Sequence, residues 1–107
     1  MRKLMQIVPS QDFRLFGAMV RKEIELYKKN QGTFYRSGAK KKDEAKWSHK
    51  RFKGWINLQR SNGEIVVVEI QSRGQSEDEW QLFHAFLGWI DRHFRKQILA
   101  INIQYRG

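Results

Sequence analysis

The spacing of apolar residues predicts a first helix in the N-terminal third of the chain. Its apolar residues recur at intervals of three and four, the period of an amphipathic helix. They are Phe13, Phe16, Val20, Ile24 and Tyr27. Ser10, directly after Pro9, is a suitable N-cap, and Gly32 is a suitable stop. We therefore expect a helix that begins after Pro9 and packs this stripe against the rest of the domain.

A second helix is predicted from Ser76 to about Phe94, and it is apolar on two sides. One stripe consists of Trp80, Phe83, Leu87, Ile90 and Phe94, and the other of Leu82, Phe86 and Trp89. A helix with two apolar sides is buried on both. The second stripe is therefore covered either by the first helix or the N-terminal segment, or by a second copy of the chain in a homodimer.

Alternating apolar and polar residues predict strands over residues 33–37, 51–60, 64–73 and 97–105. Ser61-Asn62-Gly63 lies between the second and third of these, and Asn-Gly between apolar runs is typical of a β-hairpin. Residues 37–50 show the weakest periodicity and predict a mobile basic loop or a short polar helix. The predicted order is α-β-β-β-α-β, with a short strand over residues 1–8 as a further element. This order indicates a single α+β domain over residues 1–107, with two helices on a mixed sheet of four or five strands.

The same alternation divides the predicted sheet into two faces. Apolar sets such as Val66, Val68 and Ile70 belong under the helices. The opposite face then carries Trp55, Asn57, Gln59, Glu69, Gln71, Arg73, Asn102, Gln104 and Arg106. Such a face is either an ordinary solvated surface or a surface that binds a ligand.

The net charge of +10 changes the picture, because so basic a small domain attracts polyanions. Eleven of the basic residues lie between Lys28 and Arg60, where only Asp43 and Glu44 oppose them. Nucleic acid is the commonest intracellular polyanion. The candidate phosphate contacts are Lys40, Lys41, Lys42, Lys46, Lys50, Arg51, Lys53 and Arg73. Trp47 and Trp55 are candidates for stacking on an unpaired base.

Composition excludes several other classes. The chain has no cysteine, which rules out disulfides, thiolate metal sites and cysteine nucleophiles. No apolar run approaches the roughly 20 residues of a membrane-spanning helix. The basic N-terminus has no apolar core of the kind found in signal peptides. We therefore expect a cytoplasmic domain that does not enter a membrane.

The hairpin from Gly54 to Gly74 resembles the catalytic hairpin of the PD-(D/E)XK nuclease superfamily, as found in archaeal Holliday-junction resolvases. In that family Pro-Asp opens one strand, and an apolar strand after the turn carries Glu-x-Lys. Here Glu69-Ile70-Gln71 falls at the second motif, and the element order matches the family's core. The resemblance implies that Glu69 would hold Mg²⁺, with Gln71 close to the attacking water.

Two departures from the family pattern bear on catalysis. Trp55 stands where the metal-binding Asp is expected, and Gln71 stands where the Lys is expected. Mg²⁺ requires more than one carboxylate at such a site, and Asp43 or Glu23 would have to supply the second. We therefore expect a non-cleaving relative without a metal site.

The sequence thus predicts a small, basic, non-catalytic nucleic-acid-binding domain. Two alternatives remain open. One is a Mg²⁺-dependent nuclease of the PD-(D/E)XK type, with Glu69 and Gln71 at its centre. The other is a protein-interaction module whose basic segment meets an acidic partner and whose second helix forms a homodimer.

Overall fold

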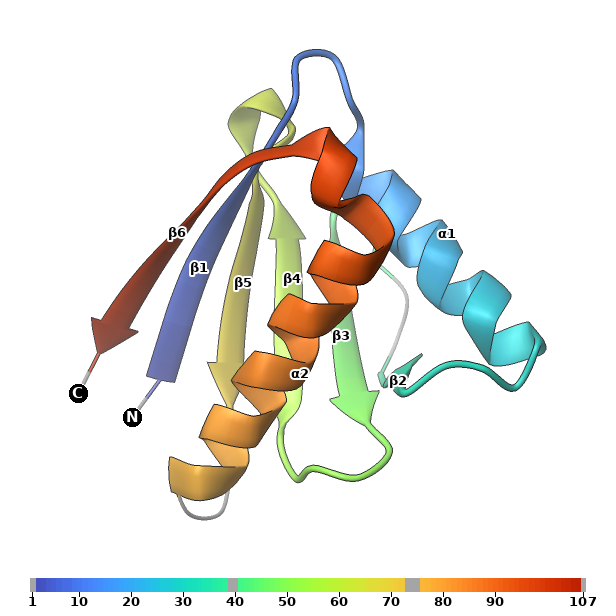
Figure 1. The fold of residues 1–107 in the computed structure, drawn as a ribbon, viewed down its shortest axis with the longest axis vertical. Coiled ribbons are helices and arrows are strands. Elements are labelled where there is room, and N and C mark those ends of the chain that lie inside the picture. Colours follow the sequence, from blue (N-terminus) through green and yellow to red (C-terminus); the bar gives the residue numbers. More distant parts are fainter. Residues whose placement is uncertain (1, 39–40, 73–75, 107) are drawn as a thin grey trace.

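The computed structural model describes residues 2–38, 41–72 and 76–106. Its elements, in chain order, are β1 (Arg2–Pro9), α1 (Leu15–Lys28), β2 (Phe34–Arg36), β3 (Glu44–His49), β4 (Trp55–Arg60), β5 (Val66–Gln71), α2 (Ser76–Phe94) and β6 (Ile98–Arg106) (Figure 1). Short 3₁₀ turns at Asn62–Glu64 and Arg95–Gln97 precede β5 and β6. The α+β class expected from the sequence is confirmed.

The sheet has six strands in the order β2-β3-β4-β5-β1-β6, and every neighbouring pair is antiparallel. The prediction of a mixed sheet with four or five strands is therefore wrong. The N-terminal strand β1 forms, and it lies inside the sheet between β5 and β6. The first and last strands thus run side by side, which brings the two chain ends together (Figure 1).

The additional strand is β3, which lies within the segment expected to be a loop or a short helix. Its side chains alternate: Trp47 is buried, whereas Glu44 and Lys46 are exposed. Lysine and glutamate are depleted in strands. Here these charges stay in water on one face, while the indole on the other face enters the core. Burial of Trp47 therefore outweighs the weak strand propensity of its neighbours.

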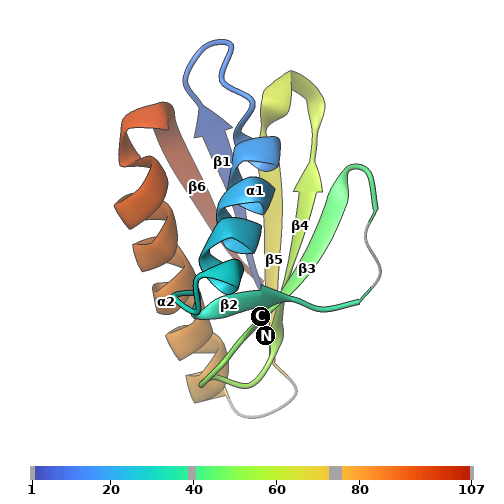
Figure 2. The same cartoon turned by 90° about the vertical axis from the view of Figure 1, so that its right-hand side faces the viewer.

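Both helices lie on the same side of the sheet and leave its other side uncovered (Figures 1 and 2). The sheet contributes Met5, Ile7, Ile56, Leu58, Val66, Val68 and Ile70 to the core. From α1 the buried residues are Leu15, Phe16, Met19 and Glu23. Of the expected stripe, Phe16 is buried, and Phe13 and Val20 are partly buried against the core, so the stripe is confirmed for these three. Phe13 precedes the helix, and Tyr27 is exposed. Arg14, rather than Ser10, occupies the N-cap position, because the chain turns at residues 10–13 before the helix begins.

The structure also overturns the homodimer seam proposed for α2. Leu82, Phe86 and Trp89 are all buried within the monomer. Strands β2 and β3 cover this stripe: the Trp47 ring centre lies 5.1 Å from that of Trp89, and the Phe34 ring centre lies 6.1 Å from that of Phe86. Neither of these two strands is expected from the sequence to cover the stripe. The strand that the sequence pattern did not reveal supplies the missing partner.

Candidate nucleic-acid interface

The uncovered side of the sheet, here called the open face, is mostly polar. In the β4–β5 hairpin, Trp55 pairs with Gln71, Asn57 with Glu69, and Gln59 with Val67. Residues directly opposite each other on antiparallel strands point to the same side. Strands β1 and β6 add Gln6 opposite Asn102, and Leu4 opposite Gln104. The predicted division of the sheet into an apolar and a polar face is thus confirmed for these pairs.

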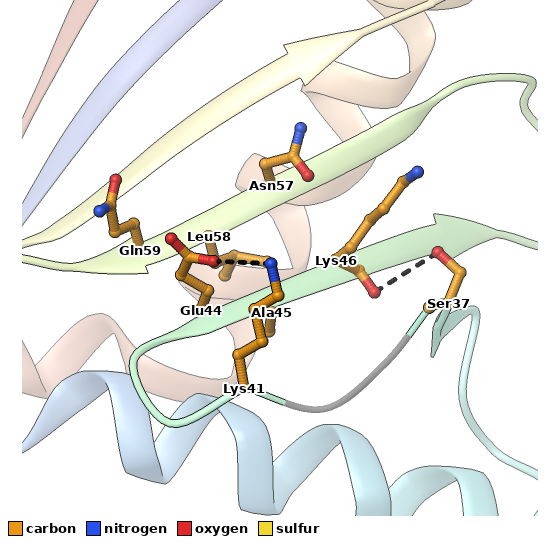
Figure 3. A pocket seen from close by; sticks show the side chains of 9 residues that line it. Ser37, Lys41, Glu44, Ala45, Lys46, Asn57, Leu58 and Gln59 are labelled. Atoms are coloured by element: carbon orange, nitrogen blue, oxygen red, sulfur yellow. Dashed lines mark hydrogen bonds and ion pairs between the residues drawn. The ribbon is translucent and has the colours of Figure 1, made fainter.

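Cations gather at the β3–β4 end of the open face. The Lys46 ammonium nitrogen lies 5.0 Å from the ring centre of Trp55, which is a cation–π distance. Lys46 and Lys41 also line a hollow of about 330 Å³ together with Asn57 and Gln59 (Figure 3). Lys41 is ion-paired with Glu44 at 3.5 Å, and both side chains are largely exposed. Such an exposed pair is weak and competes little with an incoming phosphate.

The loop between β3 and β4 forms a second, more basic hollow. Lys50, Arg51 and Lys53 line a space of about 410 Å³. The aromatic residues Tyr35, Phe52 and Trp55 also line it. Trp55 adjoins this hollow and also lies under Lys46, so the indole links the loop cations to the cation on β3. One strand cation therefore contacts the half-buried indole, and the loop cations line the hollow beside it, with Arg51 lying over the ring of Phe52.

His49, the last residue of β3, positions this loop. Its Nδ1 accepts the backbone N–H of Arg51 at 3.0 Å and that of Phe52 at 3.3 Å. The ring stacks on Phe52 and meets Phe34 edge-on. Burial lowers the pKa of His49, and the nearby Arg51 lowers it further. The imidazole is therefore held neutral with Nδ1 as an acceptor. The sequence carries no motif that reveals this role.

Gly54 permits the loop to return into β4. Its φ of +119° is unfavourable for any residue with a Cβ, and an added Cβ would lie 2.3 Å from the carbonyl oxygen of Gln71. The chain must therefore pass very close to β5 at this point. This requirement accounts for a glycine directly before Trp55.

The prediction is wrong for one residue of this interface, and it concerns two further residues that the structure does not describe. Trp47 has an exposed fraction of 0 % and cannot stack on a base, because its place on β3 directs it into the core. Lys40 and Arg73 lie outside the described residues. Lys42 is exposed just before β3. The other candidates are placed at the two hollows by the contacts given above.

The acidic residues considered for a metal site are not brought together. Glu69 lies on the open face, where its carboxylate accepts a hydrogen bond from the Gln71 amide. Asp43 is ion-paired with Arg60 at the far end of β4. Glu23 is buried on α1, on the opposite side of the sheet. Among the described residues, no three His, Asp or Glu side chains gather in a way that fits a metal ion.

Comparison with family models, curated proteins and solved structures finds no match for this chain. The resemblance to the PD-(D/E)XK nucleases therefore stays a prediction. None of the described helices is long and apolar enough to cross a membrane.

Proposed function

We propose that this protein binds nucleic acid without cleaving it, through the β3–β4 end of the open face. The observation that carries the proposal is the place of Trp55: Lys46 lies over its half-buried indole, and the same indole lines a hollow together with Lys50, Arg51 and Lys53. Cations alone suit any polyanion. An aromatic ring set among them favours a polyanion that also carries bases.

Single strands fit this arrangement better than duplexes. A base can stack on Trp55 only when it is not already stacked within a helix. The cations around the indole would then hold the phosphates on either side of that base. Gln71 lies opposite Trp55, and Asn57 and Gln59 follow along the same side of β4, where amides can donate to and accept from base edges. We therefore propose single-stranded DNA or RNA as the ligand class.

Binding of four labelled oligonucleotides tests this proposal: single- and double-stranded DNA, and single- and double-stranded RNA. We expect tighter binding of the single strands, weakened by added salt, and no cleavage of any of the four with or without Mg²⁺. Equal, salt-independent affinity for all four would contradict the proposed site. Mg²⁺-dependent cleavage that is lost in Glu69→Gln would instead establish the nuclease alternative.

A further inference from the structure

The last strand, β6, forms one edge of the sheet, and its outer side has no neighbour among the described strands. It is nine residues long, whereas the strand at the other edge, β2, has only three. Along an edge strand, alternate peptide groups point away from the sheet and can pair with another strand. A long edge is therefore a ready template for sheet extension.

The side chains of β6 do not protect this edge. Natural edge strands are usually guarded by lysines, prolines or inward-pointing charges. Residues 98–105 of β6 contain no Lys, Arg, Asp, Glu or His, and only its last residue, Arg106, is charged. Leu99 is 71 % exposed, and Ile103 and Tyr105, which lie on the helix side of the sheet, are 37 % and 64 % exposed. The helices leave this end of the sheet uncovered (Figure 1).

We propose that β6 pairs antiparallel with β6 of a second copy of this chain. In an antiparallel pair, residues that face the same side stand opposite each other. Leu99, Ile101, Ile103 and Tyr105 of one copy would therefore meet the same apolar set of the other. In the register that pairs Leu99 with Tyr105 and Ile101 with Ile103, Asn102 of one copy would meet Asn102 of the other, and their amides can hydrogen-bond to each other. The strand is thus complementary to itself, as a two-fold interface requires.

The charge distribution favours a second copy at this edge in spite of the net charge of +10. The basic residues around Trp55 lie near β3, four strands away from β6 in the sheet order, and Arg106 lies at the very end of β6. At about 4.8 Å per strand the separation is roughly 19 Å, more than twice the Debye length of about 8 Å at physiological ionic strength. Two copies joined through β6 therefore keep their basic clusters far apart. Their open faces would lie on the same side and form one surface.

The oligomeric state in solution, measured by light scattering without nucleic acid, tests this proposal. We expect the wild type to have twice the mass of one chain, and Leu99→Lys and Ile103→Lys to reduce it to the mass of one chain. Tyr27→Lys is the matched control, because it places a lysine at an exposed apolar position on α1 and should leave the dimer intact. Circular dichroism establishes that each variant is folded. A wild type that stays monomeric at every concentration, or lysine variants that remain dimers, would overturn the proposal.

Cross-linking locates the contact independently. Since the chain has no cysteine, a single cysteine at each position from 100 to 104 reports only on its own surroundings. We expect oxidation to yield a disulfide-linked dimer at the position on the two-fold axis, with little at the others. Gln59→Cys, on β4, should give no such dimer. A yield no greater than that of Gln59→Cys at all five positions would contradict pairing through β6. Neither measurement involves nucleic acid, so failure of this proposal leaves the proposed function standing.

Discussion

At the scale of single residues, a substitution of Trp55 tests the contribution of base stacking separately from that of charge. Trp55→Ala should weaken binding of single strands by about 1–3 kcal/mol, or roughly 5- to 150-fold, because one stacked base is lost. The dependence of affinity on salt should change little, since no cation is removed. Fluorescence anisotropy with labelled single strands measures both quantities.

The matched control for Trp55 is Trp80→Ala. Trp80 is also partly exposed, but it lies on α2, on the helix side of the sheet. Its removal should leave the affinity unchanged. Equal losses in the two variants would show that Trp55 is not the stacking residue.

A second prediction at this scale concerns His49, whose Nδ1 accepts hydrogen bonds from two backbone N–H groups. His49→Leu and His49→Asn both remove the ring, but only Asn offers a side-chain oxygen to the N–H groups two and three residues on. At about 1 kcal/mol for each lost hydrogen bond, the Leu variant should be about 1–2 kcal/mol less stable than the Asn variant. It should also bind single strands more weakly, because Lys50, Arg51 and Lys53 lose their fixed arrangement. Chemical denaturation and anisotropy test this pair, and equal behaviour of the two variants would contradict the positioning role.

At the scale of elements, the contact of α1 with β2 is predicted to depend on pH through Glu23. Burial raises the pKa of this carboxyl above its ordinary value of 4.5, and the nearby Arg36 offsets part of the rise. A raised pKa in the folded state means that folding favours the protonated carboxyl. The wild type therefore loses stability as the pH rises from 4.5 through the raised pKa.

Glu23→Gln removes this dependence while keeping an oxygen that accepts the backbone N–H of Arg36. The free energy of unfolding of the variant should exceed that of the wild type at neutral pH, and the difference should shrink below pH 4.5. Urea denaturation at several pH values measures this difference. Glu25→Gln is the control: its exposed carboxyl interacts with Lys29 and has a lowered pKa, so its removal should not stabilise the protein at neutral pH. A difference for Glu23→Gln that is independent of pH would contradict the account.

The elements also show what the sequence can and cannot predict. The β4–β5 hairpin, α2 and the polar face of the sheet follow from local signals: an Asn-Gly turn, a run of apolar residues at helical spacing, and strict alternation. Strand β3 escapes such signals, because only Trp47 is strongly apolar within it. When β3 is missed, the second apolar stripe of α2 has no partner within the predicted fold. A homodimer contact through that stripe is therefore wrongly considered. The position of β1 between β5 and β6 cannot be predicted from local signals either, because β1 pairs with residues about 60 positions away in β5 and about 90–104 positions away in β6.

Within the proposed site, the cations and Trp55 are predicted from charge clustering and strand alternation, whereas the residues that support them are not. His49 and Gly54 act through backbone geometry that forms only when β3, β4 and β5 come together. Nothing in the sequence around this histidine indicates that its Nδ1 will accept hydrogen bonds from two backbone N–H groups. The same is true of the glycine before Trp55, whose left-handed conformation is set by the close approach of β5.

At the scale of the whole molecule, charge is distributed unevenly about the sheet. The cations next to Trp55 lie on the open face, whereas those near the end of α1 lie with the helices on the other side. If nucleic acid binds the open face, only the first group should release counterions from the ligand. Each phosphate contact to a single strand contributes about 0.7 to the slope of log affinity against log salt concentration.

The most direct test of the proposed interface is this salt slope, measured in three proteins with one labelled single strand. The wild type is compared with a Lys50→Ala, Arg51→Ala, Lys53→Ala triple variant and with a control triple variant, Lys22→Ala, Lys28→Ala, Lys29→Ala. Both triple variants lose three charges, so a general electrostatic effect lowers both slopes equally. We predict that the loop variant loses up to about 2 from the slope and that the control keeps the wild-type slope. An unchanged slope in the loop variant, or an equal loss in the control, would contradict binding at the open face.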